Sequence, residues 1–436
     1  MRCLQMVDIH RTHYADQLNE SLIGKSVRIA GWVEDLRELG SIVFLTIRDA
    51  SGGAQVIAAP EQILVSKENK LTRQSVVAIS GTVQKSKAKA FPVEIKAGEI
   101  TFLTIAQHPL PVDPTGRVGA SIDVRLDARA LDLRNPKVLS LFRIRHEALQ
   151  SVRKTLIANK FIEVNTPKII GSASEGGANL FSLEYFEKKA YLAQSPQLYK
   201  EQLTMALDRV FEIAPYYRAE KSHTIRHLNE FISIDIEGAF MDAEDVMKVA
   251  EEMVRNVLAD VKEKCGNDLK QIEVEITVPS LPFERITYAQ VLDELKKEGV
   301  SLEFGEDLPD HALRILGEKR KGYYFIVDWP LKLKPFYIHE KEGNPELSCS
   351  FDLQHGFLEL ASGGRRQHDV NRLKARLLEQ GLNPKDFEDH LKVFEWGMPP
   401  HSGWGIGLDR LVMVICNANN IREVVLYPRD TERVKP

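Results

Sequence analysis

The sequence predicts an α+β protein with two parts, a small five-stranded closed β-barrel followed by a larger domain built on an antiparallel sheet flanked by helices. Two observations carry this prediction. From Ser26 to Ile105, short β-rich runs such as VRIAGWV and SVVAISGTV alternate with turn signals. Beyond residue 134, strand-like and helical segments follow one another without the regular alternation of a doubly wound parallel sheet.

The N-terminal pattern fits a barrel of the OB type, a fold that binds nucleic acids. Residues 108–134 are rich in Pro, Gly and Asp and have no sustained period, which indicates a hinge. We therefore expect a barrel over residues 1–107 and a second domain over 135–436, with a peripheral insertion at about 265–343.

The second domain shows helical spacing of apolar residues in three segments and strand-like runs between them. A strand-like FIEVNTPKII follows the first helix. The expected helices are Leu139 to Asn159, Asp242 to Lys264 and Asp369 to Gly381. The expected strands are Ala190 to Ala193, Arg209 to Ala214, Phe231 to Phe240, Tyr323 to Asp328, Phe336 to His339, Ser350 to Leu353 and Phe357 to Ala361.

Composition excludes several classes of protein. The 436 residues are 43% hydrophobic and 28% charged, as in folded globular proteins. The four cysteines form no CxxC pair, so neither a disulfide framework nor a zinc site is expected. The sequence has no membrane-spanning run and no signal peptide, which predicts a cytoplasmic protein without a membrane partner. The net charge of −4 predicts local rather than general contact with nucleic acid, and no DNA partner.

One cluster of charged residues lies on a predicted hairpin. The strand-like FEIAPYYRAE breaks into a polar loop and resumes as FISIDIE. The hairpin carries Arg218, Glu220, His223, Arg226 and His227, which suit a polyphosphate and a purine. The common nucleotide-binding motifs, GxxxxGK[ST] and a GxGxxG between strand and helix, are absent from the sequence.

A second cluster lies near the C-terminus, where GWGIGLDRL brings three glycines close to Arg410. Glycines allow close backbone approach, and an arginine on the adjoining helix can meet phosphate. Upstream, Asp352, Glu359 and Ser362 offer oxygen ligands to a hard cation. Taken singly, such groups also occur as surface salt bridges or tight turns.

Together these segments resemble the three signature motifs of the class II aminoacyl-tRNA synthetases, in the same order: a segment ending at Pro167, the hairpin FEIAPYYRAE…RHLNEF, and GWGIGLDRL. Within that class the chain is similar to the aspartyl enzymes of the archaeal and eukaryotic type. It has their QSPQLYK string at 194–200, a flipping-loop sequence SEGGANLF at 174–181 and a terminal VVLYPRD. The resemblance implies ATP-dependent charging of tRNA(Asp) with L-aspartate, Mg²⁺ as a cofactor, and a homodimer with Pro167 near its interface.

The resemblance also implies roles for individual residues. Arg218 would contact the α-phosphate of ATP and Arg410 the γ-phosphate, with Glu359 completing the catalytic set. Phe231 would stack on the adenine, and Glu220 would hold its amino group. Glu359 and Ser362, with Asp352, would bind Mg²⁺. The full expected ATP site is Arg218, Glu220, His223, Arg226, His227, Leu228, Phe231, Glu359, Gly407 and Arg410.

The amino-acid site must accept a short carboxylate and reject the amide. A buried cation does this, because an amide would leave its charge unpaired. Lys200 and Arg366 are the expected cations, and Glu175, Gln197 and Asp235 are candidates for the substrate ammonium, with Ser362 nearby. An asparaginyl enzyme shares the architecture but should not place a lysine after QSPQLY, so Lys200 is the discriminating residue.

In the barrel, the resemblance places Phe44 and Gln55 against the middle anticodon base, and Arg37 beside the RNA backbone. The residue after GWV is tryptophan in strict archaeal-type relatives and histidine in those that also charge tRNA(Asn), but here it is Glu34. A carboxylate there would accept a hydrogen bond from the amino group of the cytosine that ends the aspartate anticodon and would repel the O4 acceptor of uracil in the asparagine anticodon, which predicts a strict enzyme. The alternatives are a non-discriminating enzyme, and a larger role for Lys87.

Overall fold

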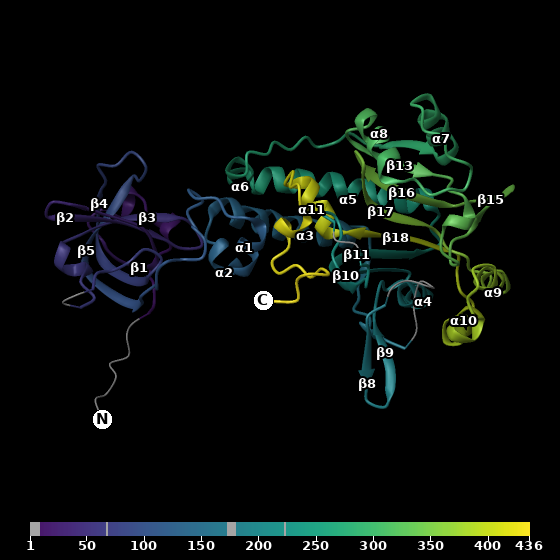
Figure 1. The fold of residues 1–436 in the computed structure, drawn as a ribbon, viewed down its shortest axis with the longest axis horizontal. Coiled ribbons are helices and arrows are strands. Elements are labelled where there is room, and N and C mark those ends of the chain that lie inside the picture. The colour runs from purple at the N-terminus through teal and green to yellow at the C-terminus, as the bar shows by residue number, and fades with distance from the viewer. Residues whose placement is uncertain (1–8, 67–68, 172–179, 222–223) are drawn as a thin grey trace. The chain divides into compact units, whose positions relative to one another are not determined.

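A computed structural model describes residues 9–66, 69–171, 180–221 and 224–436 of the chain. The chain divides into two compact units, Met1–Gly119 and Ala120–Pro436 (Figure 1). Residues 120–134, expected as part of a hinge, belong to the second unit, where they form α1 (Ile122–Asp127) and α2 (Arg129–Asp132). The buried Arg129 guanidinium holds them there by donating to the backbone oxygens of Glu423 and Leu426 at 2.8 and 3.1 Å.

The first unit is the predicted five-stranded OB-type barrel, closed in the order β1-β2-β3-β5-β4. Side chains alternate along its strands, so Val43, Leu45 and Ile47 fill the core while Phe44 faces outward. The strands are β1 (Ser26–Leu39), β2 (Ile42–Arg48), β3 (Gly53–Ala58), β4 (Val76–Lys85) and β5 (Val93–Thr104), with short 3-10 helices η1 (Ala15–Gln17), η2 (Glu20–Leu22) and η3 (Pro60–Ile63).

The second unit is built on an eight-stranded sheet in the order β12-β13-β16-β17-β18-β11-β10-β6, mostly antiparallel. Within the described part of this sheet, only the two outer pairs, β12 with β13 and β10 with β6, are parallel. Its strands are β6 (Ile162–Glu163), β10 (Arg209–Tyr217), β11 (Glu230–Ala239), β12 (Glu284–Thr287), β13 (Tyr323–Val327), β16 (Ser350–His355), β17 (Leu358–Arg365) and β18 (His401–Gly407). Two smaller sheets contain β7 (Ile169–Ile170), β8 (Ser182–Tyr185) and β9 (Lys188–Leu192), and β14 (Glu340–Lys341) and β15 (Asn344–Ser348).

Helices flank this sheet, as predicted for the second domain (Figure 1). No helix within the described ranges combines the length and apolar character needed to cross a membrane. The helices are α3 (Pro136–Ala158), α4 (Gln197–Leu207), α5 (Ala243–Lys264), α6 (Gly266–Gln271), α7 (Tyr288–Lys297), α8 (Asp310–Lys319), α9 (Val370–Glu379), α10 (Glu388–Phe394) and α11 (Leu408–Ile415), with 3-10 turns η4 (Leu331–Leu333), η5 (Pro384–Phe387) and η6 (Ile421–Val424).

The two faces of the sheet differ because side chains alternate along each strand. In β11, Ile234 and Ile236 join the large apolar core with α3 and α5, whereas Asp235 lines a pocket on the opposite face. The neighbouring strand β18 repeats the pattern, with Trp404 in the core and Gly405 lining the pocket. The sheet therefore has one apolar face for stability and one polar face for a ligand.

Two expectations for the second domain need correction or extension. Residues Phe336 to His339 are not a strand. Their apolar side chains are buried in a separate cluster with α9 and α10, so their hydrophobicity reflects packing rather than sheet pairing. The stretch 265–343, expected as a peripheral insertion, supplies the edge strands β12 and β13 of the main sheet.

Candidate active site

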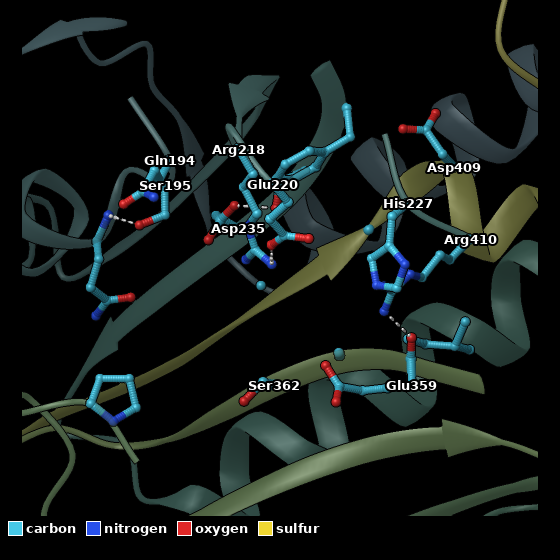
Figure 2. A pocket seen from close by; sticks show the side chains of 18 of the residues that line it. Gln194, Ser195, Arg218, Glu220, His227, Asp235, Glu359, Ser362, Asp409 and Arg410 are labelled. Carbon is cyan, nitrogen blue, oxygen red and sulfur yellow. Dashed lines mark hydrogen bonds and ion pairs between the residues drawn. The ribbon is translucent and has the colours of Figure 1, made fainter. Parts of the chain in front are cut away.

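One pocket gathers most of the predicted site residues on the polar face of the sheet (Figure 2). Each comes from a strand or helix end that the sheet brings to the same place. The predicted residues that line the pocket are Gln197, Lys200, Arg218, Glu220, Arg226, His227, Leu228, Phe231, Asp235, Glu359, Ser362, Arg366, Gly407 and Arg410. Glu175 and His223 lie outside the described residues.

The pocket has two ends with different chemistry. We call the region around Arg218, Glu220, Arg226, His227 and Arg410 the hairpin end, because most of these residues lie in or after β10 and before β11. The α4 end lies at the start of that helix and is formed by Gln197, Lys200, Asp235, Glu237 and Arg366. In Figure 2, Gln194 and Ser195, next to α4, lie on the opposite side of the pocket from His227 and Arg410.

The hairpin end concentrates positive charge. Arg410 donates a hydrogen bond to the backbone oxygen of Glu359 at 2.9 Å, and burial lowers the pKa of its guanidinium. Burial and the nearby Arg410 also lower the pKa of His227, which favours its neutral ring. Arg218 lies 5.3 Å from the centre of the Phe231 ring and 3.9 Å from Glu220. Three arginines beside an aromatic ring suit a nucleoside polyphosphate.

The α4 end is a buried network of ion pairs. Lys200 Nζ donates to Asp235 Oδ1 at 2.9 Å and to the backbone oxygen of Trp404 at 3.2 Å. Arg366 Nε donates to Glu237 Oε1 at 3.0 Å. Although burial opposes its charge, the Glu237 carboxylate raises the pKa of Arg366. Lys200, Asp235, Glu237 and Arg366 are at most 4% exposed, so water does not screen these charges.

Asp352, Glu359 and Ser362 fit a divalent cation. Asp352 and Ser362 are cross-strand partners in β16 and β17. Asp352 Oδ2 accepts from Lys334 at 2.7 Å, but its Oδ1 is buried without a hydrogen-bond partner. Burial and the negative charge of Asp352 raise the pKa of Glu359. Two crowded carboxylates and a hydroxyl are suitable ligands for Mg²⁺, which prefers few protein oxygens and completes its shell with water or phosphate. No group of three His, Cys, Asp or Glu side chains suited to a metal occurs among the described residues.

The predicted anticodon residues Glu34, Arg37, Phe44 and Gln55 lie on the neighbouring strands β1, β2 and β3 of the barrel. Arg37 pairs in register with Phe44, and Thr46 pairs with Gln55. Phe44 is outside the barrel core, which favours a role at the surface. Glu34 is held by Arg48, whose Nε and Nη2 donate to its two carboxylate oxygens at 2.6 and 2.9 Å. Lys87 is exposed in the connection between β4 and β5.

The pocket also contains residues that the sequence analysis did not assign. Ser233 donates to Asp235 Oδ2 at 2.6 Å, and their spacing of two along β11 could have indicated a shared face. Gln194 and Ser195 belong to the QSPQLYK string itself. Lys334 and Tyr337 had no sequence signal, because they lie in the stretch 265–343 that carries no motif.

Comparisons with known proteins agree with this geometry. Residues 121–431 match the family model of class II tRNA synthetases (D, K and N), and residues 27–103 match that of the OB-fold nucleic acid binding domain. The chain is 47% identical over 433 residues to the aspartate–tRNA(Asp/Asn) ligase of Methanothermobacter thermautotrophicus, covering 98% of this chain and 99% of the relative. It is 46% identical over 429 residues to the ligase of the same name from Archaeoglobus fulgidus, covering 97% and 99%.

Solved structures give the same assignment of fold. The asparaginyl-tRNA synthetase of Pyrococcus horikoshii, in complex with asparaginyl-adenylate, superimposes with a TM-score of 0.92 at 33% identity, covering 98% of this chain and 100% of that one. Family models, full-length relatives and structural neighbours therefore agree that the chain belongs to the class II tRNA synthetases of the D, K and N group.

Proposed function

We propose that the protein activates L-aspartate with ATP and transfers it to tRNA, and that it charges both tRNA(Asp) and tRNA(Asn). The observation that carries the choice of amino acid is the pair of buried cations, Lys200 and Arg366, at the α4 end of the pocket. Relatives at 46–47% identity over almost the whole chain are named aspartate–tRNA(Asp/Asn) ligases, which supports both parts of the proposal.

Recognition of aspartate rests on charge balance at the α4 end. Lys200 and Arg366 are already paired with Asp235 and Glu237, so the site holds equal numbers of buried cations and anions. We assign the substrate ammonium to Asp235 and Gln197, which frees Lys200 to bind the side-chain carboxylate, with Arg366 beside it still paired with Glu237. An asparagine amide would supply no charge to those cations, at a cost of several kcal/mol in a buried site, roughly the cost of an unpaired buried polar partner.

The fold alone does not select aspartate, because the structural neighbours include asparaginyl-tRNA synthetases. The discrimination therefore depends on individual side chains. We regard Lys200 as the residue that separates the two specificities in this chain, because it follows QSPQLY and reaches the buried carboxylates from α4.

The hairpin end would bind ATP. We assign Arg218 to the α-phosphate, Arg410 to the γ-phosphate, Phe231 to the adenine ring and Glu220 to its amino group, with Arg226, His227, Leu228 and Gly407 completing the site. When Mg²⁺ is bound by Glu359, Ser362 and Asp352, it neutralises charge on the phosphate oxygens.

Neither chemical step requires a nucleophile from the protein. In the first step, the α-carboxylate of aspartate attacks the α-phosphorus of ATP, and the bond between that phosphorus and pyrophosphate breaks. In the second, a terminal ribose hydroxyl of the tRNA attacks the activated carbonyl, and AMP leaves. Arg218 and Arg410 act by orienting the phosphates and by stabilising charge at phosphorus.

The proposal that both tRNAs are charged replaces the strict specificity for tRNA(Asp) that was expected from Glu34. That expectation required a carboxylate free to accept a hydrogen bond from cytosine. Both oxygens of Glu34 accept from Arg48, and this ion pair offsets the negative charge of the carboxylate, so we expect it to select the base only weakly. We therefore favour the non-discriminating alternative, with Phe44, Gln55, Arg37 and Lys87 contributing contacts common to both tRNAs.

We also propose a homodimer formed beside β6, the outermost strand at one edge of the main sheet. Ile157, Ile162 and Ile169 around this edge are between 47% and 59% exposed, and Pro167 is exposed among them. Apolar exposure at a sheet edge favours pairing with a second copy. Light scattering after size-exclusion chromatography should give about twice the chain mass, and a monomer at micromolar concentration would contradict the proposal.

The decisive experiment charges transcripts of tRNA(Asp) and tRNA(Asn) with labelled aspartate and labelled asparagine, using one enzyme preparation. Aspartate on both tRNAs supports the proposal. Aspartate on tRNA(Asp) alone restores the strict interpretation of Glu34. Charging with asparagine would contradict the roles given to Lys200 and Arg366.

A further inference from the structure

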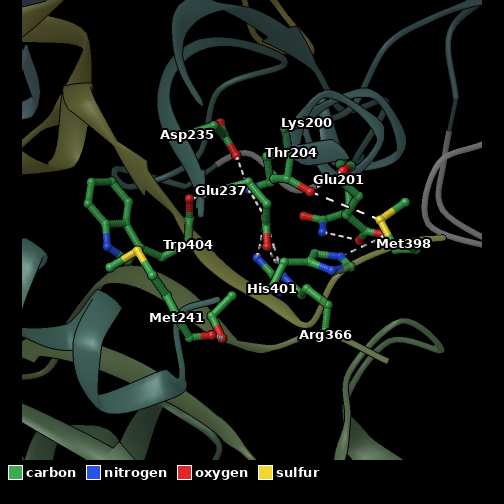
Figure 3. Close-up of polar contacts among 12 residues, drawn as sticks. Lys200, Glu201, Thr204, Asp235, Glu237, Met241, Arg366, Met398, His401 and Trp404 are labelled. Carbon is green, nitrogen blue, oxygen red and sulfur yellow. Dashed lines mark hydrogen bonds and ion pairs between the residues drawn. The ribbon is translucent and has the colours of Figure 1, made fainter. Parts of the chain in front are cut away.

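A second layer of buried polar side chains lies behind the α4 end of the pocket, formed by Glu201, His390 and His401. None of the three lines the pocket, and all are at most 3% exposed. Figure 3 shows the Glu201 carboxylate and the His401 ring facing one another beside the Lys200 and Arg366 ion pairs. None of these three residues was assigned to the binding of ATP, aspartate or Mg²⁺.

Glu201 reaches the pocket through Gln197. The two residues are four positions apart in the first turns of α4, so their side chains lie on the same face of the helix. Gln197 Nε2 donates a hydrogen bond to Glu201 Oε1. An ionised carboxylate only accepts hydrogen bonds, so it must be met by the nitrogen of the Gln197 amide. The carbonyl oxygen of that amide is then directed away from Glu201.

The two histidines keep Glu201 ionised in a fully buried position. His401 Nδ1 lies 2.8 Å from the Pro399 carbonyl oxygen, which only accepts, so Nδ1 carries a proton. His401 Nε2 and His390 Nε2 lie 3.8 and 3.4 Å from Glu201 Oε2. Although burial alone would raise it, these histidines hold the pKa of Glu201 well below its ordinary value, and the Glu201 carboxylate raises the pKa of His401.

We propose that Glu201 is a positioning residue for the amino-acid substrate. Held as a carboxylate by His401 and His390, it fixes the Gln197 amide with its carbonyl oxygen toward the α-ammonium of the bound amino acid. The inference rests on the proposed function, because it assigns that ammonium to Gln197. It adds a device that orients the substrate, since a fixed acceptor favours a charged amine and a freely rotating amide does not.

The substitution Glu201→Gln tests the device with little change of volume. A glutamine can donate as well as accept, so the Gln197 amide is free to turn its NH₂ group toward the ammonium. We expect the KM for L-aspartate in ATP–pyrophosphate exchange to rise about tenfold, the effect of one lost hydrogen bond to a charged group. The KM for ATP should change less than twofold, because the hairpin end does not depend on Glu201.

A double-mutant cycle separates positioning from a general structural role. If Glu201 acts through Gln197, adding Glu201→Gln to Gln197→Ala should leave the KM for aspartate at the value of Gln197→Ala alone. The matched control is Glu251→Gln, which removes an equally buried and hydrogen-bonded carboxylate from α5, remote from the pocket lining. It should leave both KM values unchanged.

The outcomes are distinguishable from a failure of the proposed function. Absence of aspartate-dependent ATP–pyrophosphate exchange in the unsubstituted protein would contradict the proposed function itself. Normal exchange with an unchanged KM for aspartate in Glu201→Gln, or additive effects in the double variant, would overturn the inference alone. If Glu201→Gln does not fold, the double variant His390→Gln/His401→Gln removes both rings that hold Glu201 ionised. The inference then requires a raised KM for aspartate at constant KM for ATP, and an unchanged KM overturns it.

Discussion

The two ends of the pocket hold their charges in opposite ways. At the α4 end, Lys200 and Asp235 are within 2.9 Å of each other and almost fully buried. At the hairpin end, Arg218 and Glu220 are 3.9 Å apart with 46% and 40% of their side chains exposed. Buried pairs cannot relax into water, so they discriminate sharply between charged and neutral ligands, whereas exposed pairs are screened and adaptable. We infer that amino-acid selectivity depends on the first arrangement and accommodation of a polyphosphate on the second.

The largest expected effect comes from breaking a pair at the α4 end. Lys200→Met should lower kcat/KM for aspartate in ATP–pyrophosphate exchange by about three orders of magnitude, equal to about 4 kcal/mol for a broken buried ion pair. The KM for ATP should change less than about threefold, since the hairpin end is untouched. Lys264→Met, which removes an exposed lysine of α5 that pairs with Glu147 on α3, is the control and should be neutral. A loss below tenfold would show that the two ends do not differ as described.

A smaller effect is expected at the hairpin end. Arg410→Ala should lower kcat about a hundredfold, the cost of removing one charge-stabilising donor from a transition state. The KM for aspartate should stay within about threefold of its original value. Arg372→Ala, at a surface ion pair with Glu340 and Glu379, serves as a control. A rise in the KM for aspartate comparable to that in Lys200→Met would mean that both ends act as one unit.

An effect of intermediate size is expected at the carboxylates that we propose to bind Mg²⁺, and it should depend on pH. Because burial and Asp352 raise the pKa of Glu359, Mg²⁺ must displace a proton as the pH falls through that pKa. The Mg²⁺ concentration for half-maximal exchange should therefore increase as the pH is lowered. Asp352→Asn removes one proposed ligand, so the Mg²⁺ requirement should rise about tenfold. It also removes the repulsion that raises the pKa of Glu359, so the pH dependence should move to lower pH.

A titration of activity with Mg²⁺ at several pH values checks this prediction. Glu346→Gln, an exposed carboxylate on β15 remote from the pocket lining, should reproduce the original curves. A Mg²⁺ requirement in Asp352→Asn equal to that of the original protein would remove Asp352 from the metal site.

The comparison also explains which parts of the molecule the sequence could predict. Strand period and turn signals predicted the barrel, and the strand-like FISIDIE predicted β11, on which Asp235 lies. The residues of the hairpin end stand in contiguous motifs, so a local string was enough to find them.

The rest depends on contacts between distant segments, which no local pattern encodes. Lys334 reaches Asp352 from a stretch without a motif. Phe336 to Ile338 have the composition of a strand, but they pack against α9 and α10 instead. The salt bridge between Glu34 and Arg48 joins two strands. The sequence therefore showed that Glu34 is unusual, but it did not show that Arg48 pairs with it.

The smallest expected effect concerns this salt bridge in the barrel. Because Arg48 already holds both oxygens of Glu34, Glu34→Gln should change the ratio of kcat/KM for tRNA(Asp) and tRNA(Asn) by less than about threefold, below the typical worth of a base-specific hydrogen bond. Arg48→Gln is the informative partner, because it releases the carboxylate. The ratio should then shift toward tRNA(Asp), whose anticodon ends in cytosine, by up to about tenfold. If Arg48 contacts the RNA backbone, the loss of that contact in Arg48→Gln would weaken the binding of both tRNAs equally, so it would cancel in the ratio. A shift of tenfold or more in Glu34→Gln alone would instead show that the half-buried pair of Glu34 and Arg48 opens, so that the carboxylate reads the anticodon.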